Sequence, residues 1–173
     1  MRIFKPFKPT ARRKGVHYET IPWFHLDIQH IDLTLSRPNK DFGRAFYLSD
    51  DRQQALELAQ FRAEFEETVP VVNVYDFDER LFSQFRYKRF EGYTEDWAHF
   101  VYDHRAEPQG LTLHDYDIVY GPIANDRIGA QITRFKQGYI TFDEFLRRIQ
   151  YIKGITFQYA FCTQQAVDKL IKL

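Results

Sequence analysis

The chain has 173 residues, 24 Lys and Arg against 24 Asp and Glu, and a formal net charge of zero. That balance argues against a uniformly basic nucleic-acid coat protein, and 44% hydrophobic and 17% aromatic residues argue against a wholly disordered chain. No apolar run is long enough to span a membrane, and the first residues lack the apolar stretch of a secretory signal peptide. The single cysteine, Cys162, excludes an internal disulfide and a multi-cysteine zinc site, so we expect a reducing, cytoplasmic setting.

The charge is unevenly distributed along the chain. Residues 1–14 contain six Lys and Arg and no acid, so the rest of the chain carries a net charge of −6. We expect a basic N-terminal arm over residues 1–22, with residues 1–14 mobile or bound to a partner, and a single domain over residues 23–173. A solvated terminus without a binding role is the simpler explanation of this arm, and contact with phosphates is the alternative.

The expected elements of the first half begin with strands at Trp23–Ile31 and Gly43–Ser49. Asp50 and Asp51 provide an N-cap and first-turn acids for a helix that carries apolar residues at helical spacing up to Phe65. Apolar residues on both faces of 69–75 predict a buried strand, and Asp78 starts a short helix.

In the second half, Thr94 caps a helix that carries Trp97, and Asp117–Gly121 is an expected strand. Further helices are expected at Asn125–Gln137, from Thr141 with a capping box and a hydrophobic staple, and from Thr163 to Leu173, with a strand at Thr156–Cys162 between the last two. Strands and helices of unequal length without a regular βαβ rhythm favour an α+β fold over a doubly wound sheet.

Common catalytic and metal signatures are absent, including phosphate-binding glycine loops and zinc-protease motifs. His99 and His104 are five residues apart on an expected helix, so they share a face poorly and do not suggest a metal site. Cys162 has aromatic neighbours, which is typical of a buried structural thiol.

Two stretches are unusual. In Asp41–Ser49 a glycine precedes a strand, where it lets a backbone approach a ligand closely, and Phe46 and Tyr47 must point to opposite faces. One ring then enters the core while the other lines a cleft, or both are ordinary packing residues. In Phe157–Phe161, alternation places Gln158 opposite three aromatic side chains. Its amide either faces water at a sheet edge or hydrogen-bonds a ligand.

The stretch DFGRAFYLSDDRQQA resembles the segment of ADP-ribosyltransferases of the diphtheria-toxin and poly-ADP-ribose-polymerase type that reads FGxGxYFA, and FQYAF resembles the strand with their third catalytic residue. A bacterial family of unknown function in the same clan is more similar. Its blocks correspond here to Arg37–Ser49, Gln54-Ala55, Val71–Asp78, Tyr116–Arg127 and Gln158–Thr163.

The resemblance implies two small sheets packed face to face as a split β-sandwich around an NAD cleft, with helices outside. It implies that Tyr47 stacks on nicotinamide, that Gln158 occupies the position of the usual glutamate, and that His25 holds the ribose, with His17 as a rival. It also implies cofactor contacts from the block that contains Arg37, Asp41, Phe42, Gly43 and Ser49.

The chain departs from the family pattern in three ways. The usual YHG start is absent, Ala45 replaces a glycine, and Gln158 replaces glutamate. Glutamine can bond a ribose hydroxyl but cannot act as a base at neutral pH, so extension of poly-ADP-ribose chains is not expected.

The expected function is a toxin-like mono-ADP-ribosyltransferase that cleaves NAD without a metal and transfers ADP-ribose to a cellular protein or nucleic acid. A small antitoxin-like protein is the expected partner. The alternative is a degenerate member that binds NAD, a nucleotide or a partner protein without catalysis. A third hypothesis is that the basic arm brings the domain to an RNA or DNA acceptor.

Overall fold

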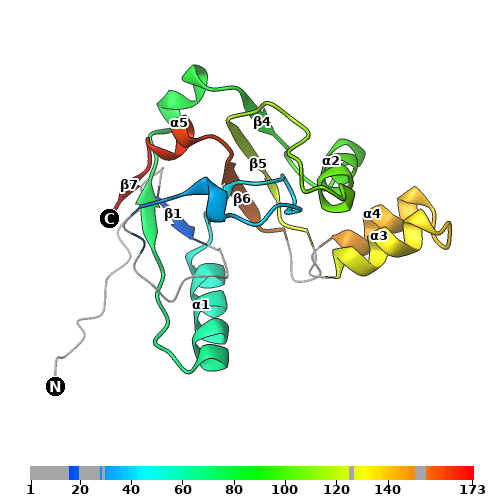
Figure 1. The fold of residues 1–173 in the computed structure, drawn as a ribbon, viewed down its shortest axis with the longest axis horizontal. Coiled ribbons are helices and arrows are strands. Elements are labelled where there is room, and N and C mark those ends of the chain that lie inside the picture. Colours follow the sequence, from blue (N-terminus) through cyan, green and yellow to red (C-terminus); the bar gives the residue numbers. More distant parts are fainter. Residues whose placement is uncertain (1–15, 20–27, 29, 125–126, 151–154) are drawn as a thin grey trace.

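The strands of the protein form one sheet, flanked by helices. The structure, a computed structural model, describes residues 16–19, 28, 30–124, 127–150 and 155–173. Within these ranges seven strands join in the order β4-β5-β6-β2-β1-β3-β7 (Figure 1). The strands are β1 Val16–Glu19, β2 Phe46–Ser49, β3 Val74–Asp76, β4 Tyr87–Arg89, β5 Ile118–Pro122, β6 Phe157–Phe161 and β7 Ile171–Lys172.

Five α-helices and two 3₁₀ helices are described. α3 and α4 contact each other and lie beside α2 at one end of the molecule, whereas α1 contacts β1 and β2 (Figure 1). The helices are η1 Leu33–Leu35, α1 Arg52–Glu66, η2 Glu79–Gln84, α2 Glu95–Ala106, α3 Ile128–Lys136, α4 Phe142–Ile149 and α5 Gln164–Val167.

The α+β class is confirmed, but the described strands do not separate into two packed sheets. β1 pairs antiparallel with both β2 and β3, and so joins the two halves into one hydrogen-bonded sheet. β4 and β5 are parallel, and the other described pairs are antiparallel. The expectation of two small sheets packed face to face is therefore corrected, since the described strands form one sheet.

Local signals place several helix starts correctly. The Asp51 side chain accepts from the amides of Gln53 and Gln54 at the start of α1, Thr94 accepts from an amide of α2, and Thr141 accepts from the amide of Glu144 in α4. Each cap satisfies amides that have no partner inside the helix, which is why these short polar residues mark the boundaries.

The sheet buries side chains on both faces. On one face Tyr47, Val119 and Ala160 join a cluster with residues of α2, α3 and α4. The opposite face carries a second cluster, built from the alternate residues of the same strands and aromatic side chains near η2: Phe46, Leu48, Ile118, Tyr120, Tyr159, Phe161, Phe77 and Phe82. The alternation predicted for β6 is confirmed, and Gln158 lies on the face of the first cluster.

The end of the chain differs from its predicted helix. α5 ends at Val167, and β7 then pairs with β3 and forms the edge of the sheet. Ala166 and Val167 are already buried in the second cluster, so one helical turn completes the packing. The following residues instead satisfy backbone groups of β3, where the amide of Leu173 donates to the carbonyl of Val74.

The predicted strand over 69–75 is also shorter, because β3 spans only Val74–Asp76 and Val69 is 75% exposed. The helix begun by Asp78 is the 3₁₀ helix η2. β4 was not predicted. Of the strand expected at Trp23–Ile31, residues 23–27 and 29 lie outside the described residues, and the described ones form no strand.

Residues 1–15 and 20–22 of the expected arm also lie outside the described residues. Within the arm range, Val16–Glu19 forms β1, an inner strand of the sheet. Across the described part of the chain, no helix is both long and apolar enough to cross a lipid bilayer.

Candidate functional site

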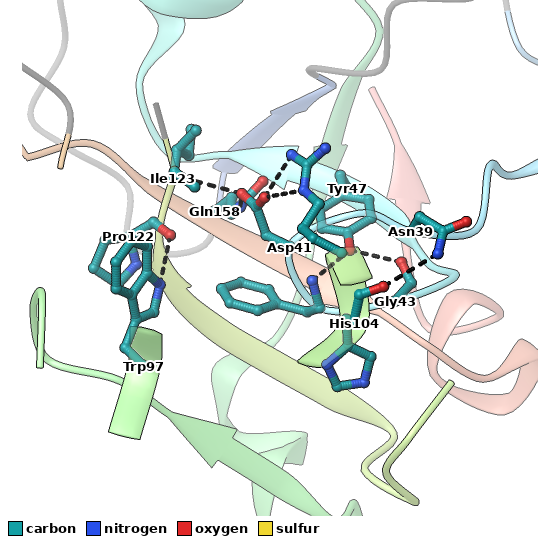
Figure 2. Close-up of polar contacts among 12 residues, drawn as sticks. Asn39, Asp41, Gly43, Tyr47, Trp97, His104, Pro122, Ile123 and Gln158 are labelled. Atoms are coloured by element: carbon teal, nitrogen blue, oxygen red, sulfur yellow. Dashed lines mark hydrogen bonds and ion pairs between the residues drawn. The ribbon is translucent and has the colours of Figure 1, made fainter. Parts of the chain in front are cut away.

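The Asp41 carboxylate is the centre of a buried polar cluster. Asp41 is 4% exposed and lies in the loop before β2. Its Oδ1 accepts from Nε and Nη2 of Arg105 at 2.8 and 2.6 Å, and its Oδ2 accepts from the amide of Ala124 at 3.1 Å and from Nε2 of Gln158 at 2.8 Å (Figure 2). All of these partners are donors, which suits an ionised carboxylate.

Gln158 is a buried residue of a central strand. It is 6% exposed, and β6 lies between β5 and β2. The interpretation of a glutamine that faces water at a sheet edge is therefore wrong. A buried amide is costly without partners, and here Nε2 has the carboxylate of Asp41.

The structure brings Tyr47 and Gln158 together on one face of the sheet. Ser49 is directly opposite Gln158, and Tyr47 is two residues from Ser49 on β2. Side chains two residues apart along a strand share a face, so Tyr47, Ser49 and Gln158 all point to the same side. Figure 2 shows Tyr47 and Gln158 on neighbouring strands, with Asp41 close to both.

Tyr47 braces the loop that precedes its own strand. Its hydroxyl donates to the carbonyl of Gly43 at 2.8 Å and accepts from the amide of Phe42 at 3.1 Å. Burial raises the pKa of the Tyr47 hydroxyl well above its ordinary value, so the phenol is neutral. The ring is 5% exposed and stacks on Phe42. Phe46 is buried as well, so both rings of the pair pack inside the protein.

Gly43 is needed for close backbone packing. Its φ is +82°, a left-handed conformation that suits glycine, and an added Cβ would lie 3.0 Å from Cδ2 of His104 and 3.2 Å from Oγ1 of Thr112. The backbone at this glycine thus lies close to α2 and the following loop, and its expected approach to a ligand stays a prediction. Phe42 is fully buried between Tyr47, Phe90 and Phe100.

Ser49 belongs to a second polar group beside Gln158. Its hydroxyl is 3.0 Å from Oε1 of Gln54 and accepts from the amide of Asp51 at 3.0 Å. Nε2 of Gln54 donates to Oγ1 of Thr156 at 3.1 Å. This group joins the start of α1 to the strand that carries Gln158.

The structure describes the remaining predicted site residues only in part. Arg37 is exposed in the loop between η1 and β2. His25 lies outside the described residues. For His17 the structure gives the backbone position, in β1 opposite Tyr75 of β3.

The hydrogen bonds between α2 and the loop that contains Asp41 were not predicted from the sequence. Arg105 holds Asp41 from the last turn of α2, and Nδ2 of Asn39 donates to the carbonyls of His104 and Glu107 at the end of that helix. Asn39 thus satisfies carbonyls that a helix end leaves without partners. A separation of 64 residues between Asp41 and Arg105 leaves no local signal of their contact.

Two neighbouring histidines bond backbone groups of α2, of the loop after α2 and of the loop before β2. The amide of Leu113 donates to Nε2 of His104, so that nitrogen carries no proton and Nδ1 donates to the carbonyl of Phe100. The arrangement at His114 is the mirror of this, because Nδ1 accepts from the amide of Tyr116 and Nε2 donates to a carbonyl, that of Phe42. These backbone hydrogen bonds of His104 and His114 were not predicted from the sequence, where His104 was considered only for a metal site.

No metal or nucleophile chemistry is evident in this cluster. In the described ranges, no group of three or more His, Cys, Asp or Glu side chains is arranged to hold a metal ion. Burial raises the pKa of the Cys162 thiol to about 12, so the reactive thiolate is disfavoured, as expected for a structural cysteine. The groups that the cluster offers for hydrogen bonding are an amide, a carboxylate and hydroxyls, on a sheet face that also carries apolar residues.

The fold and this cluster define an α+β protein with an Asp–Arg–Gln group, in which Asp41 and Gln158 are buried, at the junction of β2, β5, β6 and α2. The chain matches the family described as "Protein of unknown function (DUF3990)" over residues 25–172, and it belongs to that family. No curated protein and no solved structure matches the chain.

Proposed function

We propose that the protein is a mono-ADP-ribosyltransferase that cleaves the nicotinamide–ribose bond of NAD and transfers ADP-ribose to a protein or nucleic acid. The observation that carries the proposal is the placement of Tyr47 and Gln158 on one face of two neighbouring strands, 111 positions apart in sequence. The resemblance stated above assigns these two residues to one NAD site, and such a site requires that they share a face.

The reaction needs a hydrogen-bond acceptor beside the ribose 2′-hydroxyl. Departure of nicotinamide leaves positive charge on the anomeric carbon, as in glycoside hydrolysis. Oε1 of Gln158 is the atom we assign to the ribose 2′-hydroxyl, since Nε2 is committed to Asp41. A fixed acceptor at this position stabilises the developing charge more than it stabilises bound NAD.

An amide at position 158 also limits the product. Glutamine cannot remove a proton from an incoming ribose hydroxyl, so the proposed activity is a single transfer or hydrolysis of NAD, and not extension of a chain. We also propose an antitoxin-like protein as the partner that restrains this activity, an assignment that rests on the resemblance.

A second candidate is a protein of the same fold that binds NAD, a nucleotide or a partner protein without consuming it. The observation that favours it is the state of Tyr47, whose ring is 5% exposed and whose hydroxyl is hydrogen-bonded twice within the loop. Stacking on nicotinamide requires part of that ring face to become accessible.

The two candidates are separated by incubating the purified chain with NAD labelled on the adenosine side and with cell lysate. Protein and nucleic acid are then recovered separately, and free nicotinamide is measured. Nicotinamide release with label in one fraction supports the transferase, and release with no label in either supports hydrolysis. Binding of NAD by calorimetry without any nicotinamide release supports the binding protein and contradicts the transferase.

A further inference from the structure

We propose that Asp41 is a positioning residue, which fixes the orientation of the Gln158 amide and makes glutamine the required residue at position 158. This inference rests on the proposed function, because it concerns the same NAD site. It starts from the 2.8 Å hydrogen bond between Nε2 of Gln158 and Oδ2 of Asp41, two side chains that are both nine-tenths or more buried.

The hydrogen bond determines which way the amide faces. An ionised carboxylate only accepts, so the NH₂ group of Gln158 must face Asp41, and Oε1 must point away from it. Asp41 is itself held on three sides, by Arg105 of α2, by the amide of Ala124 after β5, and by Gln158 of β6. An acceptor held in this way is already oriented before substrate binds, which is the condition for effective charge stabilisation.

The same geometry opposes glutamate at position 158. A second carboxylate would lie at hydrogen-bonding distance from Oδ2 of Asp41, whose Oδ1 is already paired with the guanidinium of Arg105. Two close carboxylates cannot both ionise readily, so the pair would share a proton. Restoring the carboxylate of the family pattern by Gln158→Glu alone is therefore expected to impair this site.

The test compares NAD consumption by four forms of the full chain: wild type, Asp41→Asn, Gln158→Glu and the double variant. Asp41→Asn is expected to lower kcat about tenfold or more, with KM for NAD within about twofold, because the amide of Gln158 loses its fixed orientation. The kcat of Gln158→Glu is expected to be lowest at high pH and to recover as pH falls, since a protonated Glu can donate to Asp41 as the amide does.

The double variant reverses the hydrogen bond, because the Asn side chain can donate to the Glu carboxylate, and it gives up the bond that Oδ2 of Asp41 accepts from the amide of Ala124. It is expected to exceed both single variants in kcat and to lose the extra pH dependence of Gln158→Glu. Rescue of this kind distinguishes positioning from a general loss of stability, which two substitutions would only increase.

Asp117→Asn is the matched control. Asp117 is also buried and also bonded to an arginine, Arg86, but it precedes β5 whereas Ala124 follows that strand. Its substitution is expected to lower stability and to leave kcat unchanged.

The outcomes separate the two proposals. If the wild type is active and the effects of the two single variants on kcat are additive and independent of pH, the positioning role is overturned and the proposed function is not. Wild type that releases no nicotinamide overturns the proposed function and, with it, the positioning role. A fall in kcat for Asp117→Asn equal to that for Asp41→Asn also overturns the positioning role, because any buried Asp–Arg pair would then have the same effect.

Discussion

The imidazole rings of His104 and His114 lie with their centroids 5.1 Å apart, and both nitrogens of each ring are hydrogen-bonded to the backbone. One nitrogen of each ring accepts from an amide, so both rings are neutral in this arrangement. A proton added to either ring would face an N–H donor and break the hydrogen bond from the amide of Leu113 at His104 or from the amide of Tyr116 at His114, both in the loop between α2 and β5.

This pair predicts a loss of stability in mild acid. Burial lowers the pKa of both histidines below the ordinary 6.5. At His104 the charge of Asp103 opposes this shift. At His114 the charge of Asp115 opposes it, and the charge of Arg86 lowers the pKa further. Below pH 6.5 the unfolded chain then binds more protons than the folded one. The stabilisation that comes from the two neutral histidines is therefore fully present above that pH. As pH drops further, the free energy of unfolding falls by at most about 1.4 kcal/mol per pH unit for each histidine.

Urea unfolding between pH 5 and pH 7.5 measures this slope. His114→Gln is expected to reduce it, whereas His99→Gln, on the exposed side of α2, is expected to keep it. A slope that is the same in both variants would assign the acid sensitivity to other groups.

The Tyr47 hydroxyl predicts a separate effect on stability. Tyr47→Phe keeps the ring but removes the bond to the Gly43 carbonyl and leaves the amide of Phe42 without its acceptor. The free energy of unfolding is expected to fall by about 1–3 kcal/mol. Tyr139→Phe, at a residue that is 75% exposed, is the control and is expected to change it very little. Equal effects of the two substitutions would contradict the bracing role of Tyr47.

Tyr47→Ala tests the ring in the proposed NAD site. Loss of stacking is expected to remove about 1 kcal/mol of binding free energy, which is about a five- to tenfold rise in Kd for NAD measured by calorimetry. Tyr47→Phe, which keeps the ring, is the control for stacking and is expected to stay close to wild type. An unchanged Kd in Tyr47→Ala would remove Tyr47 from the cofactor site.

Gln158→Ala separates binding from turnover. The bond from Oε1 to the ribose is most needed as charge develops, so kcat is expected to fall about tenfold or more while the Kd for NAD changes much less. Gln53→Ala, on the exposed surface of α1, is the control. A loss confined to NAD binding would make Gln158 a binding residue only.

Gly43→Ala tests the left-handed turn before β2. A φ of +82° and a Cβ 3.0 Å from His104 are expected to lower the free energy of unfolding by about 1–2 kcal/mol or more. Gly129→Ala in α3 is the matched substitution, because a Cβ there meets nothing within 4 Å and alanine favours helix. A thermal melt in which both variants behave alike would show that the turn is not under this constraint.

The sequence by itself determined the elements whose signals are local. Asp51, Thr94 and Thr141 each cap the helix that follows, because a side-chain oxygen reaches an amide two or three residues ahead. Alternation in β6 likewise fixed which residues share a face, since the period of a strand is two. These signals do not depend on the rest of the fold.

Tertiary structure alone decided the pairing of the strands and the partners of the site. The short strands β1, β4 and β7 form because a neighbouring strand supplies their hydrogen bonds, and the two to four residues of each strand do not indicate that neighbour. The contacts of Asp41 with Arg105 and Gln158 join residues 64 and 117 positions apart. A buried carboxylate takes whichever donors the fold brings to it, so its partners follow from the packing of α2 against the sheet and not from the residues beside it in sequence.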